Sequence, residues 1–483
     1  MGLFERRSEE RRQDSMSRKD DVEMTTSASA SASLGDPRSP AAAHTKSKKG
    51  HHHLPIYNHK GHKVTPGIQP DGESGRRGIH PLHFFKIVWA SSSDASRLVN
   101  ILWPVVPAAI AVRYALPDHQ LLIFILNYIA MVPCANLIGF AGQELARKMR
   151  KVFGVLTETT LGSVVEIILF MVLLSRDKIQ VIQAAILGSI LATQLLCLGL
   201  CFFVGGLTMD EQEFDSAVSE VGGGLLLVAG FGLMIPAVFK VANQGKTNVT
   251  TAVIDAKVLD MSHITAILLI VAYFTYLWFQ ARTHHGIYDA IFERDEERDA
   301  DRQRDLDKNK LTLTECIIAL AVSITLVTYI AIALVEQIDY MVETHGISDS
   351  FIGLILIPLV EKAAEHLTAV DEAYDNQMNF ALSHVLGATI QTALFNAPLA
   401  VIVGWGLGKE MSFAFEIFDV VVLILAILVV GRFLDDQKSN YLEGALCVIV
   451  YMIIAVAAFF YPNPIIDTAT GTIVERSIEA LAG

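Results

Sequence analysis

Long apolar stretches recur along this chain from Leu98 onward, each close to the length that an α-helix needs to cross a bilayer. Because lipid offers no hydrogen bonds, each stretch must satisfy its own backbone polar groups, which favours helices. The sequence therefore predicts an all-α integral membrane protein with about eleven transmembrane helices. The stretches lie near residues 98–115, 119–142, 152–175, 179–206, 221–241, 260–281, 311–335, 350–371, 379–406, 412–431 and 441–461.

The charge pattern narrows the class of function. Charged residues make up 18% of the chain, below the roughly 25% of an ordinary soluble protein. The net charge of −13, without a basic and aromatic surface pattern, argues against a nucleic-acid partner. The sequence has no Walker-type phosphate loop, so we expect no nucleotide and no cofactor besides the transported ions.

A dense mixed-charge run at residues 282–310 divides the apolar stretches into two groups. It is too polar to span a membrane and too charged to pack, so we expect a cytoplasmic linker. With the first stretch set apart, five stretches lie on each side, so the second half enters the membrane from the opposite face, as in inverted-repeat transporters. The expected parts are a disordered cytoplasmic tail (1–80), a membrane entry with the first helix (81–118), a first five-helix repeat (119–281), the linker (282–310), a second five-helix repeat (311–461) and a C-terminal tail (462–483).

Basic residues in the short loops assign the two sides of the membrane. Arg147, Lys148, Arg150 and Lys151 follow the second apolar stretch, and Arg282 follows the sixth. Cytoplasmic loops carry an excess of Lys and Arg. These loops and the N-terminus are therefore expected on the cytoplasmic side.

Three glutamates stand out in the middle of apolar stretches, where an ionised side chain costs at least about 2.5–3.5 kcal/mol unless it meets a partner, water or an ion. Glu166 lies in the third stretch, and Glu361 and Glu365 lie in the eighth. Glu158, Gly162 and Glu166 are spaced by four residues and share one helix face, and Glu361 and Glu365 repeat this spacing. Acidic helices at matching positions of two halves predict a paired cation site.

The fourth and ninth stretches resemble each other and supply further polar groups. Each has a Leu-Gly-small-small segment and a glutamine, Gln183 before it and Gln391 after it. Ser163 and Thr389 add hydroxyl groups. Calcium binds about 6–8 oxygens, which two carboxylates with amides, hydroxyls and backbone carbonyls can supply. A buried carboxylate favours its protonated form and a bound cation favours the ionised form, so proton and metal compete, as an antiporter requires.

Five segments, in this order, resemble the cation/proton exchangers of the calcium/cation antiporter superfamily, in particular fungal vacuolar members. The resemblance covers roughly residues 98–461. It implies one extra helix plus two inverted five-helix repeats, and exchange of cytosolic Ca2+, or a related metal cation, for lumenal protons across the vacuolar membrane. It also implies that Glu166 and Glu365 bind the cation and the proton, together with Gln183 and Gln391. The segments are GVLTETTLGSVVEIILF, IQAAILGSILATQLLCLGL, TAILLIVAYFTYLWFQARTHH, GISDSFIGLILIPLVEKAAEHLTAV and LGATIQTALFNAPL.

Several positions depart from the Gly-Asn-x-x-Glu motif of that family. Ser163 replaces the asparagine of the first motif, and Glu361 and Lys362 replace the glycine and asparagine of the second. Glu158 replaces a further asparagine. These four residues and Thr389 are accessory candidates for the site. An ammonium beside a divalent-cation site repels the ion unless Glu361 or Glu158 neutralises it.

The departures keep other functions open. A monovalent Na+/K+:H+ exchanger of the same fold, a cation channel and a degenerate relative without transport are the alternatives. Membrane lipid and the transported cations are the expected partners. The sequence leaves the number of subunits open, including a homo-oligomer.

Overall fold

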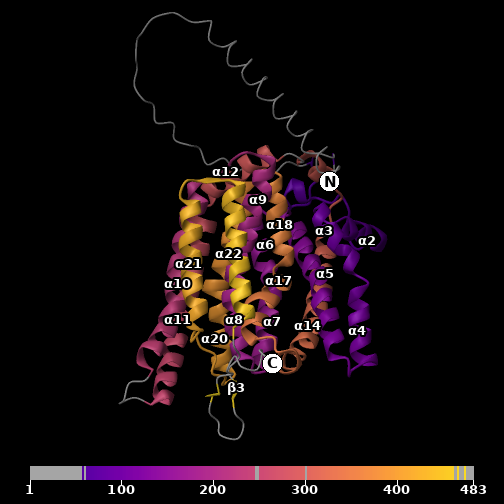
Figure 1. The fold of residues 1–483 in the computed structure, drawn as a ribbon. Helices are drawn as coiled ribbons and strands as arrows, with labels where there is room; N and C mark the ends of the chain where they lie inside the picture. The colour runs from indigo at the N-terminus through magenta and orange to yellow at the C-terminus, as the bar shows by residue number, and fades with distance from the viewer. Residues whose placement is uncertain are drawn as a thin grey trace, which may run out of the picture. The chain divides into compact units, whose positions relative to one another are not determined.

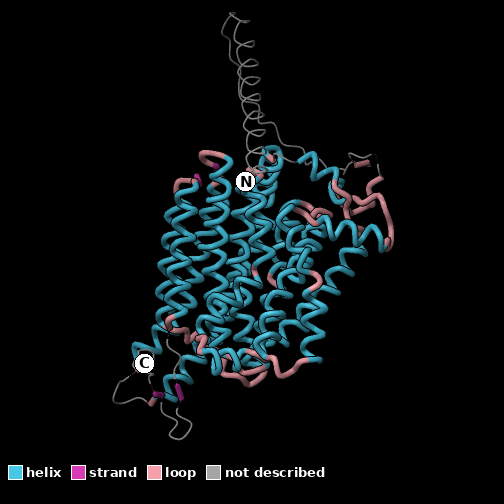
Figure 2. Tube along the Cα trace, turned by 45° about the vertical axis from the view of Figure 1, so that its right-hand side comes forward, coloured by secondary structure: helices cyan, strands magenta, loops and turns pink. Residues whose placement is uncertain are grey.

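The computed structural model describes residues 57–58, 61, 63–244, 250–299 and 302–461, with the short antiparallel strands β3 (Ile465–Ile466) and β4 (Ile473–Val474). Within these residues, ten helices are long and apolar enough to cross a membrane. They run side by side, with α12 (His285–Arg298) at one end of the bundle and β3 at the other (Figure 1). Helix dominates the whole described trace (Figure 2). The predicted all-α membrane class is confirmed.

Part of the predicted disordered tail lies against the bundle. Lys148 Nζ donates a hydrogen bond to Gly72 O at 2.7 Å, and His80 N donates to Glu315 Oε1 at 3.0 Å. Residues 63–80 therefore belong to the folded body. Residues 1–56 of the predicted tail, and most of the predicted C-terminal tail, lie outside the described residues.

The chain enters the membrane through short helical pieces. The first candidate span begins at Asp94, earlier than the predicted 98–115, and ends at Ala115. Pro104 is the N-cap of the last piece, where a missing N–H is tolerated, so it does not disrupt the helix that follows. The pieces are η1 (Pro70–Gly72), α2 (Pro81–Ala90), α3 (Asp94–Val99), η2 (Asn100–Leu102) and α4 (Val105–Ala115).

In the first predicted repeat the first, fourth and fifth spans are each built on one long α-helix. The second and third spans are each divided into shorter pieces. The second span breaks after Gly162, and the third contains a π-helical turn. Such turns release backbone groups from the regular α-helical hydrogen bonds and are frequent at functional sites. The elements are α5 (Gln120–Ala146), α6 (Lys151–Gly162), α7 (Val164–Ser175), α8 (Ile179–Leu191), the π-turn η3 (Ala192–Cys197), α9 (Leu198–Thr208), α10 (Ser216–Asn243), α11 (Thr251–Trp278) and the π-turn η4 (Phe279–Thr283).

The second predicted repeat is divided at matching places. Its first helix starts at a capping box, in which Thr312 and Glu315 bond to each other's backbone N–H groups. The predicted stretch 350–371 forms four short pieces, so it is not among the ten long helices. The elements are α14 (Leu313–Val335), α15 (Ile338–His345), α16 (Asp349–Phe351), the π-turn η5 (Ile352–Leu356), α17 (Ile357–Glu361), α18 (Ala363–Tyr374), α19 (Met378–Gln391), the π-turn η6 (Thr392–Asn396), α20 (Ala397–Gly406), α21 (Ile417–Leu434) and α22 (Tyr441–Phe459).

The charged linker packs against the bundle, so the expectation that it is too charged to pack is wrong. It forms α12 and α13 (Arg302–Asp307). Asp295 of α12 accepts hydrogen bonds from Asn379 N and Phe380 N, at 2.7 and 3.2 Å, at the start of α19. Burial raises the pKa of Asp295 above its ordinary value. The helix is amphipathic: the residues it buries are Tyr288, Ile291, Phe292 and Asp295.

The two halves of the bundle pack against each other reciprocally. α5 packs along α14, α9 contacts α22, and α11 contacts α20. The loop strands β1 (Gln212–Glu213) and β2 (Lys438–Ser439) pair in antiparallel fashion across the halves. An inverted repeat predicts such an exchange of partners, and the repeat layout itself stays a prediction. The most buried spans are Ile179–Thr208 and Met378–Gly406.

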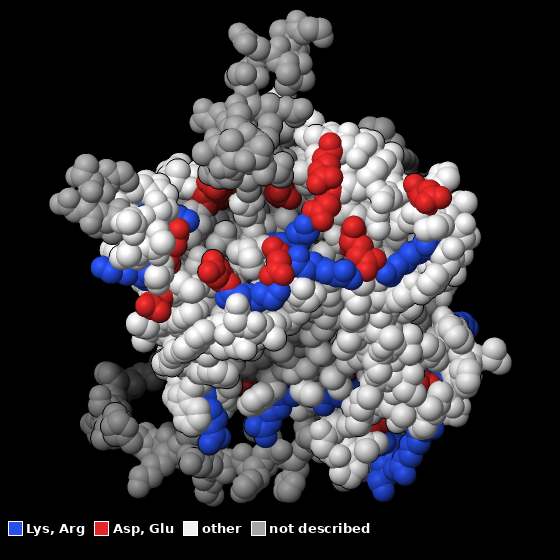
Figure 3. Space-filling model, turned by 90° about the horizontal axis from the view of Figure 1, so that it is seen from below, with Lys and Arg blue, Asp and Glu red and all other residues white. Residues whose placement is uncertain are grey.

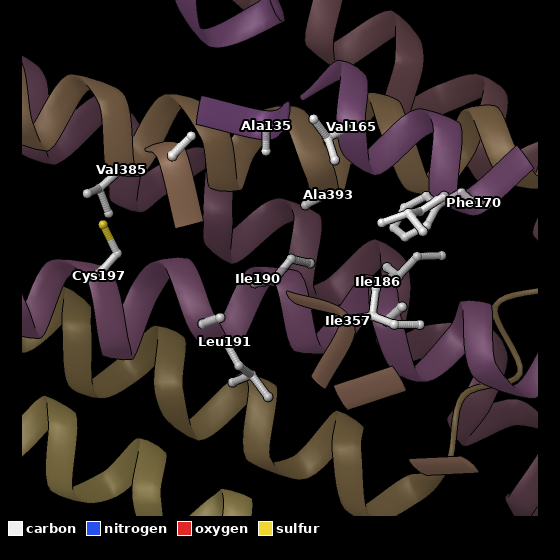
Figure 4. Packing of buried hydrophobic residues seen from close by; sticks show 14 of the residues in the cluster. Ala135, Val165, Phe170, Ile186, Ile190, Leu191, Cys197, Ile357, Val385 and Ala393 are labelled. Atoms are coloured by element: carbon white, nitrogen blue, oxygen red, sulfur yellow. The ribbon is translucent and has the colours of Figure 1, made fainter. Parts of the chain in front are cut away.

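Apolar side chains fill the centre of the bundle. Ala135 of α5, Val165 of α7, Ile190 of α8 and Ala393 of η6 converge there (Figure 4), and each is at most 2% exposed. Packing of this kind excludes water. A charged group placed among these side chains therefore needs a partner.

Candidate cation site

Each glutamate of the predicted pair lies in the first turn of a half-helix. The first acidic span breaks at Ser163, between α6 and α7, and Glu166 follows three residues later. The second breaks at Lys362, between α17 and α18, and Glu365 follows three residues later. The start of a half-helix offers free backbone N–H groups and the positive end of the helix dipole. Broken helices of this type line the substrate sites of transporters.

Glu166 lies at the centre of a buried polar cluster. Its Oε2 accepts hydrogen bonds from Lys362 Nζ, Thr392 Oγ1 and Asn396 Nδ2, each at 2.8 Å. The Glu166 side chain is 1% exposed. Thr392 and Asn396 belong to η6, so donors from the second half of the chain hold the carboxylate of the first half.

Lys362 joins the two glutamates of the predicted pair. Its Nζ lies 2.8 Å from Glu166 Oε2 and 3.2 Å from Glu365 Oε2. Sequence reasoning required Glu361 or Glu158 to neutralise this ammonium, whereas its ion pairs among the described residues are with Glu166 and Glu365. An internal ammonium therefore lies between the two carboxylates of the predicted cation site.

Several buried polar atoms around this cluster have no hydrogen-bond partner among the described residues. Both oxygens of Glu361, Oε1 of Glu166, the Ser189 hydroxyl and both amide atoms of Gln391 are of this kind. An unpaired buried polar group costs about 1–3 kcal/mol, so such a group needs an explanation. Hard cations such as Ca2+ bind oxygen ligands of these types. The donor types therefore suit a cation, and among the described residues no three His, Cys, Asp or Glu side chains are grouped as a preformed metal site.

Gln391 lies at this cluster, directly before η6, but Gln183 does not. Gln183 Nε2 donates to Ser412 O at 2.8 Å near the start of α8. Gln194 lies further along the same span, in η3, and is fully buried with both amide atoms unpartnered. The two glutamines are about 16 Å apart along the helix at 1.5 Å per residue. The sequence contains a weak signal, because Gln194 follows Leu-Gly-Ser-Ile after three residues and Gln391 follows Leu-Gly-Ala-Thr after one.

The predicted hydroxyl groups bond to their own helices. Ser163 Oγ donates to Thr159 O at 3.2 Å, and Thr389 Oγ1 donates to Val385 O at 2.7 Å. Both residues are fully buried, and their oxygens keep lone pairs. Sequence reasoning missed Thr392 and Asn396, the residues that contact Glu166 directly; they follow Gln391 in the stretch TALFN.

Glu158 lies apart from Glu166, at an entrance on the linker side. Its Oε2 is 3.4 Å from His384 Nε2, and His384 Nδ1 is 2.7 Å from Glu372 Oε2. Two cavities share Glu158 as a lining residue. The larger, of about 340 Å³, is lined by Asp289 of α12 and by the basic residues that follow α5. The smaller, of about 30 Å³, extends to Glu365.

The other side of the site is closed by direct helix contact. A Cβ atom built on Gly188 of α8 would lie 2.6 Å from Leu354 Cα of η5, and one built on Gly353 would lie 2.7 Å from Val181 O. The matching contact on the linker side is looser, because a Cβ atom on Gly387 would lie 3.5 Å from Thr159. The looser contact lies on the same side of the site as the two cavities.

Ion pairs tie the loops together at the end of the bundle away from the linker. Glu336 is bound by Arg176 at 2.5 Å and by Arg113 at 2.6 Å, and Lys409 binds Asp177 at 2.5 Å. Figure 3 shows the molecule from this end, with Lys and Arg side chains beside Asp and Glu side chains. These pairs join both halves of the chain and the entry helix α4.

Comparison with known sequences gives consistent matches. The family model described as sodium/calcium exchanger protein matches residues 119–282 and 316–460. Vacuolar cation/proton exchanger 2 of Oryza sativa is 32% identical over 372 residues, which cover 76% of this chain and 82% of that protein. The vacuolar calcium ion transporter of Schizosaccharomyces pombe is 32% identical over 341 residues, with coverage of 71% and 80%. The Ca2+/H+ antiporter of Aphanothece halophytica is 32% identical over 345 residues, with coverage of 70% and 90%.

A solved structure also resembles the fold. The native structure of YfkE superposes with a TM-score of 0.60 at 27% sequence identity, and covers 78% of this chain and 100% of its own. A second structure, described as the selenium-substituted Ca2+/H+ antiporter protein YfkE, gives a TM-score of 0.60 at 26% identity, with coverage of 75% and 99%.

Proposed function

We propose, since this chain belongs to the sodium/calcium exchanger protein family, that it is a secondary active antiporter exchanging Ca2+ for H+ across the vacuolar membrane. Relatives named as vacuolar exchangers and as a Ca2+/H+ antiporter support the choice of cation, counter-ion and membrane. The observation that carries the proposal is the bridging of Glu166 and Glu365 by Lys362 at the inner end of the entrance on the linker side.

The carboxylates carry the exchange itself. A glutamate at this depth is tolerated only when a proton or a cation neutralises it. Lys362 balances one unit of charge on the pair, so arriving Ca2+ competes with this ammonium and with the proton that balances the other carboxylate. The amide oxygens of Gln194 and Gln391 complete the oxygen shell. This competition needs no nucleotide.

The glycine contacts suggest which helix contacts open and close during alternating access. In the present state α8 lies against η5 through Gly188 and Gly353, and the looser packing of Gly387 leaves the linker side open. Opening the first contact while Gly387 closes on Thr159 would expose the same carboxylates to the other side. The two halves then move as bodies around a fixed site.

We assign the linker side to the cytoplasm. Arg147, Arg150 and Lys151 line the larger cavity on that side, and cytoplasmic loops are enriched in basic residues. Segment 63–80 docks at the same end through Lys148, which supports the proposal of a cytoplasmic N-terminus. The partners are membrane lipid and the transported cations.

Proton flux in sealed proteoliposomes tests the function. With an acidic lumen and a lumenal pH dye, Ca2+ added on the linker side should raise the lumenal pH. Glu166→Gln and Glu365→Gln should abolish this response. Asp419→Asn, which changes a buried carboxylate at the start of α21, is the matched control and should retain it. A wild-type protein that leaves the lumenal pH unchanged with Ca2+ would contradict the proposal.

A monovalent cation exchanger of the same fold is the second candidate. Lys362 favours it, because its ammonium already balances part of the charge on Glu166 and Glu365. The same liposomes with Na+ or K+ in place of Ca2+ separate the two functions. A response to Na+ or K+ alone would select the monovalent exchanger.

A further inference from the structure

Glu361 is a buried carboxylate that the pair of Glu166 and Glu365 does not explain. It ends α17, directly before the break at Lys362, and is 2% exposed. Neither of its oxygens has a hydrogen-bond partner among the described residues. A carboxylate in an apolar interior is retained at high cost unless something binds it.

The carboxylate pair is already partly occupied by groups of the protein itself. Glu166 Oε2 accepts three hydrogen bonds at 2.8 Å, which exceeds its two lone pairs. Lys362 Nζ also lies 3.2 Å from Glu365 Oε2. A cation entering this pair must therefore compete with an ammonium that is tethered to the chain. Glu166 Oε1 alone remains without a partner on that carboxylate.

Charge within the cluster remains unbalanced. Three carboxylates, from Glu166, Glu361 and Glu365, face the single ammonium of Lys362. The described ion pairs of Lys362 reach Glu166 and Glu365 and do not include Glu361. One ammonium can balance only one of these three charges, and Glu361 is the carboxylate that lies outside its ion pairs.

Further oxygens lie on the elements that pack against α17. Ser189 Oγ, on the facing helix α8, is fully buried and lies near enough to the Glu361 carboxyl for a weak hydrogen bond, outside standard hydrogen-bond geometry. Pro358, one turn before Glu361, has no N–H and so leaves a carbonyl of η5 without its helical donor. With Glu166 Oε1, these groups are all oxygen ligands of the type that hard cations select.

We propose that Glu361 and Ser189 form the primary cation subsite of this protein, and that Lys362 acts as the fixed counter-charge of Glu166 and Glu365. The ligand is a hard, oxygen-seeking cation such as Ca2+. The subsite lies one helical turn before Glu365, which lines the inner cavity, so the cation passes Glu365 and is then held at Glu361. This inference rests on the proposed function. It assigns the tightest cation binding to Glu361 and not to Glu166 or Glu365.

Equilibrium binding of Ca2+ to the purified full-length protein tests the subsite. Titration calorimetry and the Ca2+-dependent shift of the thermal unfolding midpoint are measured for the wild type, Glu361→Gln, Glu166→Gln and the control Asp419→Asn. Glu361→Gln should weaken Ca2+ affinity by at least about tenfold, and by more than Glu166→Gln does. Wild-type affinity in Glu361→Gln, with a loss in Glu166→Gln, would overturn the inference and leave the antiporter function intact.

Two further variants keep the test decisive if Glu361→Gln does not fold. Ser189→Ala should weaken Ca2+ binding by about threefold or more, because it removes one neutral oxygen ligand. Lys362→Gln should tighten binding, because the repulsion and competition by the ammonium are lost. Unchanged affinity in both variants would overturn the subsite. A wild type that binds none of Ca2+, Na+ and K+ would instead contradict the proposed function.

Discussion

Lys362 Nζ and Glu166 Oε2 are 2.8 Å apart, and each side chain is 1% exposed, so the centre of this exchanger contains a fully buried ion pair. The pair links the half-helix that starts at Lys362 to the half-helix of Glu166. Buried pairs add little net stability, but removing one partner alone leaves a costly charge. Lys362 and Glu166 should therefore behave as a unit.

Lys362→Met should lower the stability of the metal-free protein by about 3–5 kcal/mol, because it leaves buried carboxylates without their ammonium. In a protein that already carries Glu166→Gln, the same change should cost much less. Thermal unfolding in detergent, with a metal chelator present, measures all four proteins of this cycle. Additive effects of the two changes would contradict a functional pair. Lys438→Gln, at an exposed lysine, should leave the unfolding midpoint unchanged.

Gln194→Ala should reduce Ca2+-driven proton flux about tenfold or more, whereas Gln183→Ala should leave it within about twofold. Gln194 is fully buried in η3 with an unpartnered amide, and Gln183 bonds to a loop carbonyl near the start of α8. The two glutamines lie on the same span, so each variant is the control for the other. Equal effects of the two changes, with normal expression, would remove Gln194 from the pathway.

Gly188→Ala and Gly387→Ala should affect different properties. An added methyl at Gly188 meets the backbone of Leu354, so this variant should lower the unfolding midpoint in the present, linker-open state. At Gly387 the methyl meets Thr159 at 3.5 Å, which is an ordinary contact, so stability should stay within about 0.5 kcal/mol of the wild type. If Gly387 must close on Thr159 during transport, Gly387→Ala should still slow Ca2+ flux. Normal flux in a stable Gly387→Ala protein would argue against that closure.

The sequence predicts the membrane class well because apolar length alone decides it. The ten long helices coincide with most of the predicted stretches, and Glu166, Glu365 and Gln391 all lie in the buried centre. Which residue touches which is harder to predict, because contacts across the halves depend on helix breaks and π-turns. Sequence reasoning therefore misses Thr392 and selects Gln183, whereas Gln194 is the fully buried glutamine of the same span.

The linker shows a different limit of sequence reasoning. A high density of charges argues against packing, but the apolar residues of α12 share one face with Asp295. The Asp295 carboxylate can be buried because it accepts hydrogen bonds from backbone N–H groups at the N-terminus of α19. Such a cap depends on a partner more than eighty residues away, which no local pattern reveals.

Attachment of α12 to the bundle should depend on pH through Asp295. Because the pKa of Asp295 is raised in the folded protein, the fold favours its protonated form. The resulting stabilisation is complete below the unfolded-state pKa and is lost as the pH rises through the folded-state pKa. Protection of α12 amides in hydrogen exchange, corrected for intrinsic rates, should thus increase as the solution is acidified. Asp295→Asn should remove this slope, and Glu297→Gln, on the exposed face of α12, should retain it.

The entrance past Glu158 should be reachable from one side of the membrane only. Glu158 lines both the 340 Å³ cavity and the 30 Å³ cavity, so a thiol placed there lies on the route from the linker to Glu365. All five native cysteines are buried, so the wild type provides a low background for labelling. In sealed, oriented vesicles, Glu158→Cys should react with a membrane-impermeant maleimide added on the linker side, and at least about tenfold more slowly with reagent on the other side. Conditions that favour the opposite-facing state should slow the reaction on the linker side. Equal labelling from both sides would indicate a continuous pore, and would favour a channel over an exchanger.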